Sequence, residues 1–330
     1  MKKFAFAAVA ALTLGSVSMA HATELRLGMS APEPTPWGAA AKQMAATVAD
    51  LSGGELTINV YFGNELGDGQ TMARQIARGR LDMGLLSNVE ASLVLPEYGL
   101  LNSPYLFESL AQADCVMDDH IGNTFNAPFE QAGAVFLAPI EVGGMQILTK
   151  SPISVPADIA NHKIRTSPSP TDTYFVEASG AAAVPLSVPD TMPALKTGAV
   201  AGITTPIIMA VAGGYSSEAT EITLTDHSHQ IGAMLMSKKT WDRLNDNQRA
   251  ALVEGAKAMV GLRQSVRAAE AALLKKATAA GAHVHELSAE EKAEWQRLSP
   301  AAQEKILASI GGSAGDIWNK LEAASAECAK

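Results

Sequence analysis

Residues 24–62 read ELRLGMSAPEPTPWGAAAKQMAATVADLSGGELTINVYF, and their pattern establishes the fold class. Residues 24–29 predict a strand, and residues 56–62 alternate apolar and polar side chains as a second strand. Between them, apolar side chains recur at helical spacing until Gly53 and Gly54 end the helix. Strand, helix and strand in this order predict a parallel sheet covered by helices.

The rest of the chain continues the α/β pattern and is too long for a single core, so we expect two lobes. A proline-free stretch at 246–280 predicts one helix of ~50 Å at 1.5 Å per residue, longer than one lobe is wide. Two further helices are expected at 289–307 and 315–326. Short strands are expected at 81–86, 135–140, 145–149, 163–165, 183–186 and 200–203.

The N-terminus predicts export. Lys2 and Lys3 precede an apolar run at 4–14, and Ala20-His21-Ala22 ends in small residues, which is typical of a secretory signal peptide. We expect residues 1–22 to be removed by cleavage after Ala22. No later stretch has the ~18 consecutive apolar residues of a membrane span, so direct membrane insertion is not expected.

The formal net charge of −9 argues against nucleic acid and anionic membrane surfaces as partners. An anionic ligand would have to be bound by local positive groups. The two cysteines, Cys115 and Cys328, fit either a disulfide that ties the C-terminal tail to the middle of the chain or two free thiols. No metal or cofactor motif accompanies them.

Arg165 is the first candidate for the ligand site. It ends a short apolar strand, Lys163-Ile164-Arg165, and is followed by a loop rich in Pro and Ser that includes Ser167. An arginine offers a planar fork of donors that matches a carboxylate and stays charged. The alternative is a surface arginine in an exposed salt bridge.

Other candidates follow predicted strands. Ser87 and Asn88 come after a buried strand, at the end where open α/β sheets bind ligands. Thr35 and Trp37 follow the first strand, and Trp37 fits either an apolar wall of the site or simple packing. His227 and His229 have the spacing of one strand face, but two residues are a weak metal signal.

Several fragments in order resemble the substrate-binding proteins of tripartite ATP-independent periplasmic (TRAP) transporters, the DctP-like family. The resemblance covers essentially the whole mature chain. The fragments are Gly53-Gly54-Glu55-Leu56, residues 64–68, residues 79–84, Pro96-Glu97 with residues 104–107, residues 163–165, and residues 197–202 with Pro206.

The resemblance implies the two-lobed periplasmic-binding-protein fold, with hinge strands and a long helix spanning both lobes. Lobe I is then expected at 23–144 plus 226–262, and lobe II at 145–225 plus 263–330. It also implies that Arg165 pairs with the carboxylate of a small organic acid. A monomeric periplasmic protein without a cofactor would deliver this acid to the membrane subunits of a TRAP permease.

The chain departs from the family pattern near the predicted site. Thr204 and Thr205 stand where the family usually has an Asn, and Met145 stands where sialic-acid binders carry a second arginine. The site is therefore expected to be less charged than a sialic-acid site. A small monocarboxylate fits, and so does a sulfonate, because Ser and Thr hydroxyls suit a tetrahedral anion.

Two alternative functions would use the same cleft. One is a periplasmic enzyme with His227 or Glu141 as base, and the other is a receptor that presents its ligand to a signalling partner. Residues 311–315, GGSAG, match the nucleophile-elbow pattern, but they follow a predicted helix and no His follows them, so we interpret them as a helix–helix turn.

Overall fold

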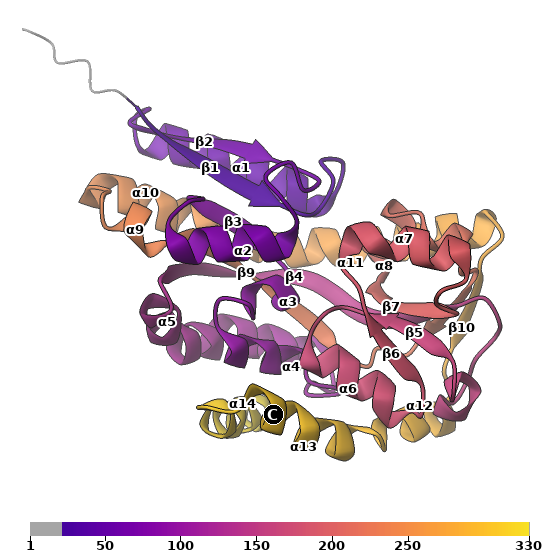
Figure 1. Ribbon diagram of the computed structural model, residues 1–330. Helices are drawn as coiled ribbons and strands as arrows, with labels where there is room; N and C mark the ends of the chain where they lie inside the picture. Colours follow the sequence, from indigo (N-terminus) through magenta and orange to yellow (C-terminus); the bar gives the residue numbers. More distant parts are fainter. Residues whose placement is uncertain (1–21, 330) are drawn as a thin grey trace, which may run out of the picture.

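The computed structural model describes residues 22–329 (Figure 1). The predicted signal peptide therefore lies outside the described residues, apart from Ala22. The architecture is α/β with two lobes, as the sequence predicts. No helix in residues 22–329 is both long and apolar enough to cross a membrane.

Lobe I is built around β1 (Thr23–Met29), which lies between β2 (Leu56–Tyr61) and β3 (Met83–Leu86) and is parallel to both. Two helices, α1 (Pro36–Leu51) and α2 (Gly69–Arg78), connect these strands. The helical spacing that predicted α1 buries Ala41, Met44 and Val48 in the core. At the end of α2, Gly79 takes a left-handed φ of 73°, which suits glycine.

Lobe II repeats this arrangement. Its central strand β5 (Lys163–Thr166) lies between β6 (Ala182–Pro185) and β7 (Gly202–Pro206), again in parallel. The connecting helices are α6 (Pro170–Ala178) and α7 (Val188–Thr197), and α8 (Ile207–Ala212) follows β7. A parallel pair, β8 (Glu221–Leu224) and β10 (His283–Glu286), extends this lobe.

The lobes are joined by strand β4 (Ala134–Thr149). Its first part pairs with β9 (His229–Ser237), and its last part, from Met145, pairs with β7 and β8. These pairings are antiparallel, so the sheet is mixed and not wholly parallel as predicted. The reason is that β4 and β9 run between the lobes in opposite directions. Their register shifts between Glu141 and Gly143, where Gly143 has a φ of 112°.

The predicted helix at 246–280 is two helices, α10 (Asp246–Ala256) and α11 (Ala258–Ala279), interrupted at Lys257. Both pack against α1, and a Cβ at Gly255 would lie 2.5 Å from Val48 Cγ2. The interruption lets the chain follow α1 closely. The expected coupling holds for α11, whose Leu262 lies in the lobe I core and whose Ala277 lies in the lobe II core.

The C-terminal region differs from the prediction. The helix expected at 289–307 is divided into α12 (Ala289–Gln296) and α13 (Ser299–Ile310), because Pro300 belongs in the first turn of a helix. The turn at 311–313 leads into α14 (Ala314–Cys328), in agreement with the helix–helix interpretation.

The predicted assignment of all of residues 263–330 to lobe II does not fit the packing. Ala302, Ile306 and Leu321 belong to a core cluster with Met72 and Phe125 of lobe I, while α13 also packs against α6 of lobe II. The C-terminal helices thus lie against both lobes (Figure 1).

Short elements complete the chain. They are α3 (Asn88–Ala91), η1 (Pro96–Asn102), α4 (Leu110–Cys115), η2 (Val116–His120), α5 (Ile121–Gln131), η3 (Pro156–Ile159), η4 (Tyr215–Ser217) and α9 (Lys238–Trp241).

Candidate functional site

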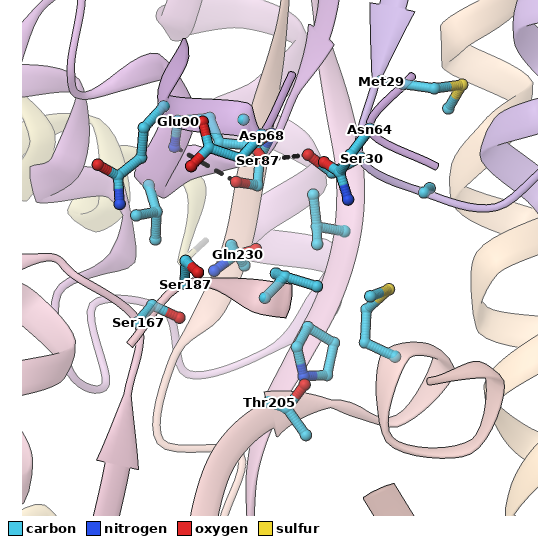
Figure 2. Close-up of a pocket in the computed structure, with 18 of the residues that line it drawn as sticks. Met29, Ser30, Asn64, Asp68, Ser87, Glu90, Ser167, Ser187, Thr205 and Gln230 are labelled. Atoms are coloured by element: carbon cyan, nitrogen blue, oxygen red, sulfur yellow. Dashed lines mark hydrogen bonds between the residues drawn. The ribbon is translucent and has the colours of Figure 1, made fainter. Parts of the chain in front are cut away.

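A pocket of about 1000 Å³, including its opening to solvent, lies between the lobes. Both lobes and the connecting strands β4 and β9 line it (Figure 2). Its apolar wall includes Trp37, Ile140, Val142 and Met209. A pocket of this kind, mostly apolar with a few placed polar groups, is typical of a small-molecule site.

Four serines of the pocket lie at or just after strand ends. Ser30 follows β1, Ser87 follows β3, and Ser167 follows β5, while Ser187 lies two residues after β6. Parallel strands present their carboxyl ends at one edge of a sheet, and the two lobes turn these edges toward each other. Figure 2 shows Ser30 and Ser87 on one side of the pocket and Ser167 and Ser187 on the other, with Gln230 between them and Thr205 at the bottom of the view.

Arg165 lines the pocket from β5 and is only 4% exposed. Its Nε and Nη2 donate to the Leu186 carbonyl oxygen at 3.1 and 2.6 Å, and its Nη1 donates to the Thr204 carbonyl oxygen at 3.2 Å. An arginine has five donors, so these bonds leave one N–H on each terminal nitrogen without a partner in the described part of the chain. Within residues 22–329 the guanidinium makes no ion pair.

The environment of Arg165 shifts its pKa in a defined direction. Burial lowers the pKa of the guanidinium, while the charge of Asp172 and the nearby Tyr215 act to raise it. An arginine nevertheless stays protonated in any such site. The pocket therefore contains a fixed positive charge with donors to spare.

Two carboxylates line the lobe I side of the pocket. Asp68 caps α2 by accepting from the Thr71 backbone N–H. Hydrogen bonding by Thr71, through its side chain first and its backbone N–H second, lowers the pKa of the Asp68 carboxyl. Glu90 accepts from the Ser30 hydroxyl at 2.5 Å and from the Ser87 backbone N–H at 2.7 Å (Figure 2). Burial raises the pKa of Glu90, and these hydrogen bonds act in the opposite direction.

Five of the predicted site residues line this pocket. They are Arg165, Ser167, Thr205, Ser87 and Trp37. The Trp37 ring forms part of the wall while its Nε1 donates to the Glu141 carbonyl oxygen at 2.7 Å, so it both packs and faces the site.

Four predicted site residues do not line the pocket. Thr35 caps α1, and the buried Asn88 donates its amide to the carbonyl oxygens of Tyr98 and Ile231. Met145 is buried in β4, where its sulfur accepts from Gln230. The Thr204 hydroxyl points to Asp172, at 2.7 Å from Oδ2, and only its backbone carbonyl reaches Arg165. In a strand, neighbouring side chains point to opposite faces, so Thr205 faces the pocket and Thr204 does not.

Several polar lining residues were not predicted from the sequence, among them Asp68, Glu90, Ser30, Ser187 and Gln230. The strand-end rule, which we applied to Ser87 and Asn88, would also have found Ser30 and Ser187. Asp68 and Glu90 read as helix-capping residues, and Gln230 enters from the connecting strand β9, so sequence pattern gave no signal for them.

The two residues considered as enzymatic bases lie outside the pocket lining. Glu141 is fully buried beside it, where His229 Nε2 lies 3.1 Å from Oε2 and Arg267 Nε donates to Oε1 at 3.3 Å. His227 stacks on Phe175 and lies 2.8 Å from the Thr225 hydroxyl. Burial lowers the pKa of His227 to about 3. His227 precedes β9 and His229 opens it, so they do not share a strand face.

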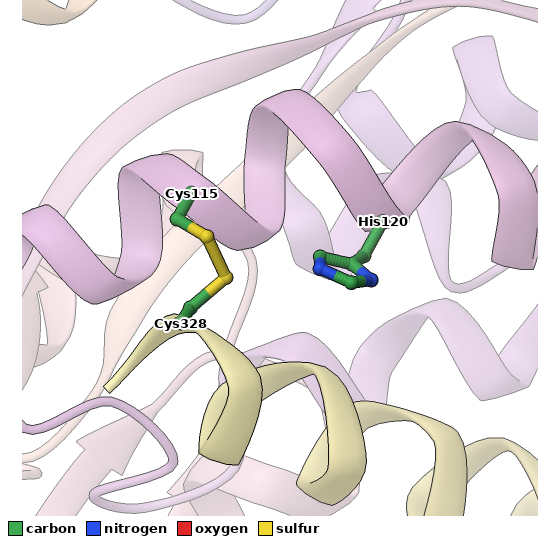
Figure 3. Close-up of side chains that lie close together, drawn as sticks. All are labelled: Cys115, His120 and Cys328. Atoms are coloured by element: carbon green, nitrogen blue, oxygen red, sulfur yellow. A yellow bond between two sulfur atoms is a disulfide. The ribbon is translucent and has the colours of Figure 1, made fainter. Parts of the chain in front are cut away.

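Cys115 and Cys328 form a disulfide in the structure, with their Cα atoms 5.7 Å apart (Figure 3). The bond joins α14 to the end of α4. His120 lies close to both sulfurs. Cysteine binds a metal as the thiolate, and the two sulfurs bonded to each other here do not supply thiolates.

The comparisons with known proteins agree with this geometry. Residues 27–309 match the model of the DctP family, bacterial extracellular solute-binding protein family 7. Over 249 residues the chain is 26% identical to the 2,3-diketo-L-gulonate-binding periplasmic protein YiaO of Escherichia coli (strain K12), which covers 75% of this chain and 76% of that protein.

Solved structures share the fold. A TRAP periplasmic solute-binding protein from Bradyrhizobium sp. BTAi1, in complex with α/β-D-galacturonate, is 26% identical with a TM-score of 0.85 over 91% of this chain and 100% of that one. The sugar acid binding protein DctPAm of Advenella mimigardefordensis, in complex with galactonate, has a TM-score of 0.87 at 23% identity over 93% and 99% of the two chains. The protein therefore belongs to family 7 of the bacterial extracellular solute-binding proteins, the family that its sequence resembles.

Proposed function

We propose that this solute-binding protein captures the monoanion of a hydroxylated organic acid of sugar-acid size and delivers it to a TRAP-type membrane permease. Arg165 carries the proposal. It is the one cationic side chain among the described residues that line the pocket. Each of its terminal nitrogens has one N–H without a hydrogen-bond partner in residues 22–329. Two N–H groups on one guanidinium match the two oxygens of a carboxylate.

The rest of the lining favours hydroxyl groups on the ligand. Ser167, Ser187 and Thr205 surround Arg165 on the lobe II side, and Asp68 and Glu90 face them from lobe I. A ligand hydroxyl can donate a hydrogen bond to a carboxylate. It can also donate to a serine hydroxyl or accept from one. A second anionic group on the ligand would meet these two acids and be repelled.

The relatives support the same class of ligand. The similar proteins from E. coli and Bradyrhizobium are named for, or hold, sugar acids, and each is about a quarter identical to this chain. Delivery to a permease is what a solute-binding protein of a TRAP system does. We further propose that the chain reaches the periplasm through the signal peptide at 1–22, so that N-terminal sequencing of the exported protein should begin at Thr23.

Binding without turnover also fits the site. Neither Glu141 nor His227 reaches the pocket, and Glu141 is already paired with Arg267 and His229. The acids that do line it serve as helix caps. We therefore expect a bound sugar acid to be recovered unchanged.

A thermal-shift panel tests the proposal, because a ligand of the folded state raises the melting temperature by mass action. The decisive set is D-galacturonate, the neutral sugar D-galactose and the dicarboxylate galactarate, with galactonate, gulonate and a sugar sulfonate added. We expect the monocarboxylates to raise the melting temperature, and galactose and galactarate to have little effect. Equal shifts with galactose would show that Arg165 does not select a carboxylate.

A further inference from the structure

Asp172 is a buried carboxylate close to Arg165 that does not line the pocket. It lies in the first turn of α6 and is 3% exposed. Its Oδ2 accepts from the Ser167 backbone N–H at 2.6 Å and from the Thr204 hydroxyl at 2.7 Å. Its Oδ1 is buried and has no hydrogen-bond partner in the described part of the chain.

These bonds connect Asp172 to both segments that hold Arg165. Thr204 donates its hydroxyl to Asp172, and its carbonyl oxygen accepts from Arg165 Nη1. Ser167, whose N–H is fixed by Asp172, lines the pocket two residues after Arg165. Removing the carboxylate would leave the Ser167 N–H without its acceptor, and the Thr204 hydroxyl with only the Arg165 carbonyl oxygen at 3.4 Å, and would loosen both segments.

Asp172 also balances the charge of Arg165 without touching it. A direct ion pair would occupy the terminal N–H groups that a ligand carboxylate needs. Thr204 separates the two side chains, so the fork stays open while the buried cation still has a counter-charge nearby. Binding of an anion then places two negative charges around one arginine.

Arg165 is the charged group that acts on Asp172. The elements packed against α6 are α13, η1, β5 and β6, and β6 has no charged residue. On η1, Glu97 accepts from the Ser313 hydroxyl, and the buried His227 beside Phe175 is neutral. The remaining charged side chains of α6, β5 and α13 are exposed, namely Lys163, Glu177, Glu304 and Lys305. Burial already raises the pKa of Asp172 against the effects of Thr204, Ser167 and Arg165.

We propose that Asp172 is a positioning residue and the exchangeable counter-charge of the anion site: it holds Ser167 and Thr204 around Arg165, and takes up a proton from solvent when the ligand carboxylate pairs with Arg165. The proposal rests on the proposed function, in which Arg165 binds that carboxylate. Binding should then strengthen as the pH falls, by at most tenfold per pH unit, while the ligand itself stays ionised above about pH 5.

Isothermal titration calorimetry with D-galacturonate, in two buffers of different ionisation enthalpy at pH 6 to 8, measures both affinity and proton uptake. We expect uptake of up to one proton by the wild-type protein. Asp172→Asn keeps an acceptor for Ser167 and Thr204 but carries no charge. It should bind at pH 8 at least as tightly as wild type, without proton uptake. Asp172→Ala should bind at least ~10-fold more weakly than Asp172→Asn, because it loses both hydrogen bonds.

Asp158→Asn is the matched control. Asp158 also accepts from two backbone N–H groups, of Ser154 and Val155, at an exposed position. It should leave affinity and proton uptake at wild-type values. Proton uptake that persists in Asp172→Asn, absence of uptake in wild type, or equal affinity of the Asn and Ala variants would each overturn the role of Asp172.

The outcomes that would contradict the proposed function differ from those that would contradict only the role of Asp172. If wild type gives no binding heat with galacturonate, galactonate or gulonate, or if Arg165→Ala binds as wild type does, the ligand assignment is wrong and the role of Asp172 is lost with it. If Arg165→Ala abolishes binding while Asp172→Asn keeps the proton uptake, only the role of Asp172 is wrong.

Discussion

Two arginines of this protein lie close to the junction of the lobes, and they differ in what their donors contact. Arg267 on α11 forks onto Asp114 at 2.9 and 2.6 Å, and its Nε and Nη2 also donate to Glu141. Arg165 donates to backbone carbonyls of Leu186 and Thr204 and to no carboxylate in residues 22–329. Arginine thus has a structural role at Arg267, where it forms ion pairs within the protein, and leaves donors open for an anion at Arg165.

The surroundings explain this difference. Arg267 contacts the carboxylates of Asp114 and Glu141 directly, Arg263 shares Asp114, and Glu270 is a further acid nearby. On the lobe II side of the pocket, the acid nearest to Arg165 in the described part of the chain is Asp172, and Thr204 lies between the two side chains. An arginine that contacts a carboxylate of the protein stabilises the fold. An arginine without such a contact can bind the carboxylate of a ligand.

The largest effect is expected at the open site. Arg165→Ala should weaken sugar-acid binding by ~2–5 kcal/mol, because the ligand carboxylate would be buried without a partner. Arg165→Lys should recover only part of this, since a point charge cannot reproduce the fork. Isothermal titration calorimetry measures both, with circular dichroism to show that the fold is intact. A lysine variant as tight as wild type would contradict a bidentate contact.

The corresponding substitution of Arg267 should lower the stability of the protein and not its ligand affinity. Arg267→Ala leaves the fully buried Glu141 with His229 as its remaining polar partner, and we expect a loss of about 3 kcal/mol in the free energy of unfolding. Ligand affinity of the folded protein should change little. Arg263→Ala is the control, because its partners Asp118 and Asp114 are both partly exposed and Glu141 keeps its contact with Arg267, so the loss should be ~1 kcal/mol or less. Urea unfolding measures these values, and a binding defect without instability would contradict the comparison.

The smallest effect concerns Glu270, which lies against Gly143 in the connecting strand β4. Burial, with Glu141 and Asp226 nearby, raises the pKa of Glu270 from 4.5 to about 8. Between these values the folded protein binds more protons than the unfolded chain, so stability falls as the pH rises through this window. Glu270→Gln removes the ionisation, and its melting temperature should exceed that of wild type by a few degrees at pH 8 but not at pH 5. A difference that stays constant with pH would contradict the assignment.

Much of the fold could be predicted because local pattern follows local physics. The strands around β1 and β5 alternate or cluster apolar residues, and Gly79 and Gly198 stand at helix ends where a left-handed φ is needed. Pattern failed where distant packing decides the outcome. The helices α10 and α11, on either side of Lys257, both pack against α1, where Gly255 lies against Val48, more than 200 residues away in sequence.

The candidate site shows the same division. Arg165 is predictable from the sequence because it stands in a short apolar strand just before a Pro- and Ser-rich loop, and an arginine there suits an anion. Thr204 and Thr205 were both predicted to bind ligand, but the alternation of a strand directs only Thr205 into the pocket. Asn88 follows Ser87 at the right strand end, yet the first turn of α3 points its amide into the protein.

The sequence by itself determined the α/β class, the family, and the presence of an arginine suited to an anion, because these depend on residue type and periodicity along the chain. Only the tertiary structure decided which polar groups meet at the pocket, which arginine keeps its donors open, and where the cysteines pair. Those outcomes depend on distances between segments far apart in sequence, such as β5 with β7 and α4 with α14. The sequence specifies the side chains of such segments, and tertiary packing determines which of the segments come into contact.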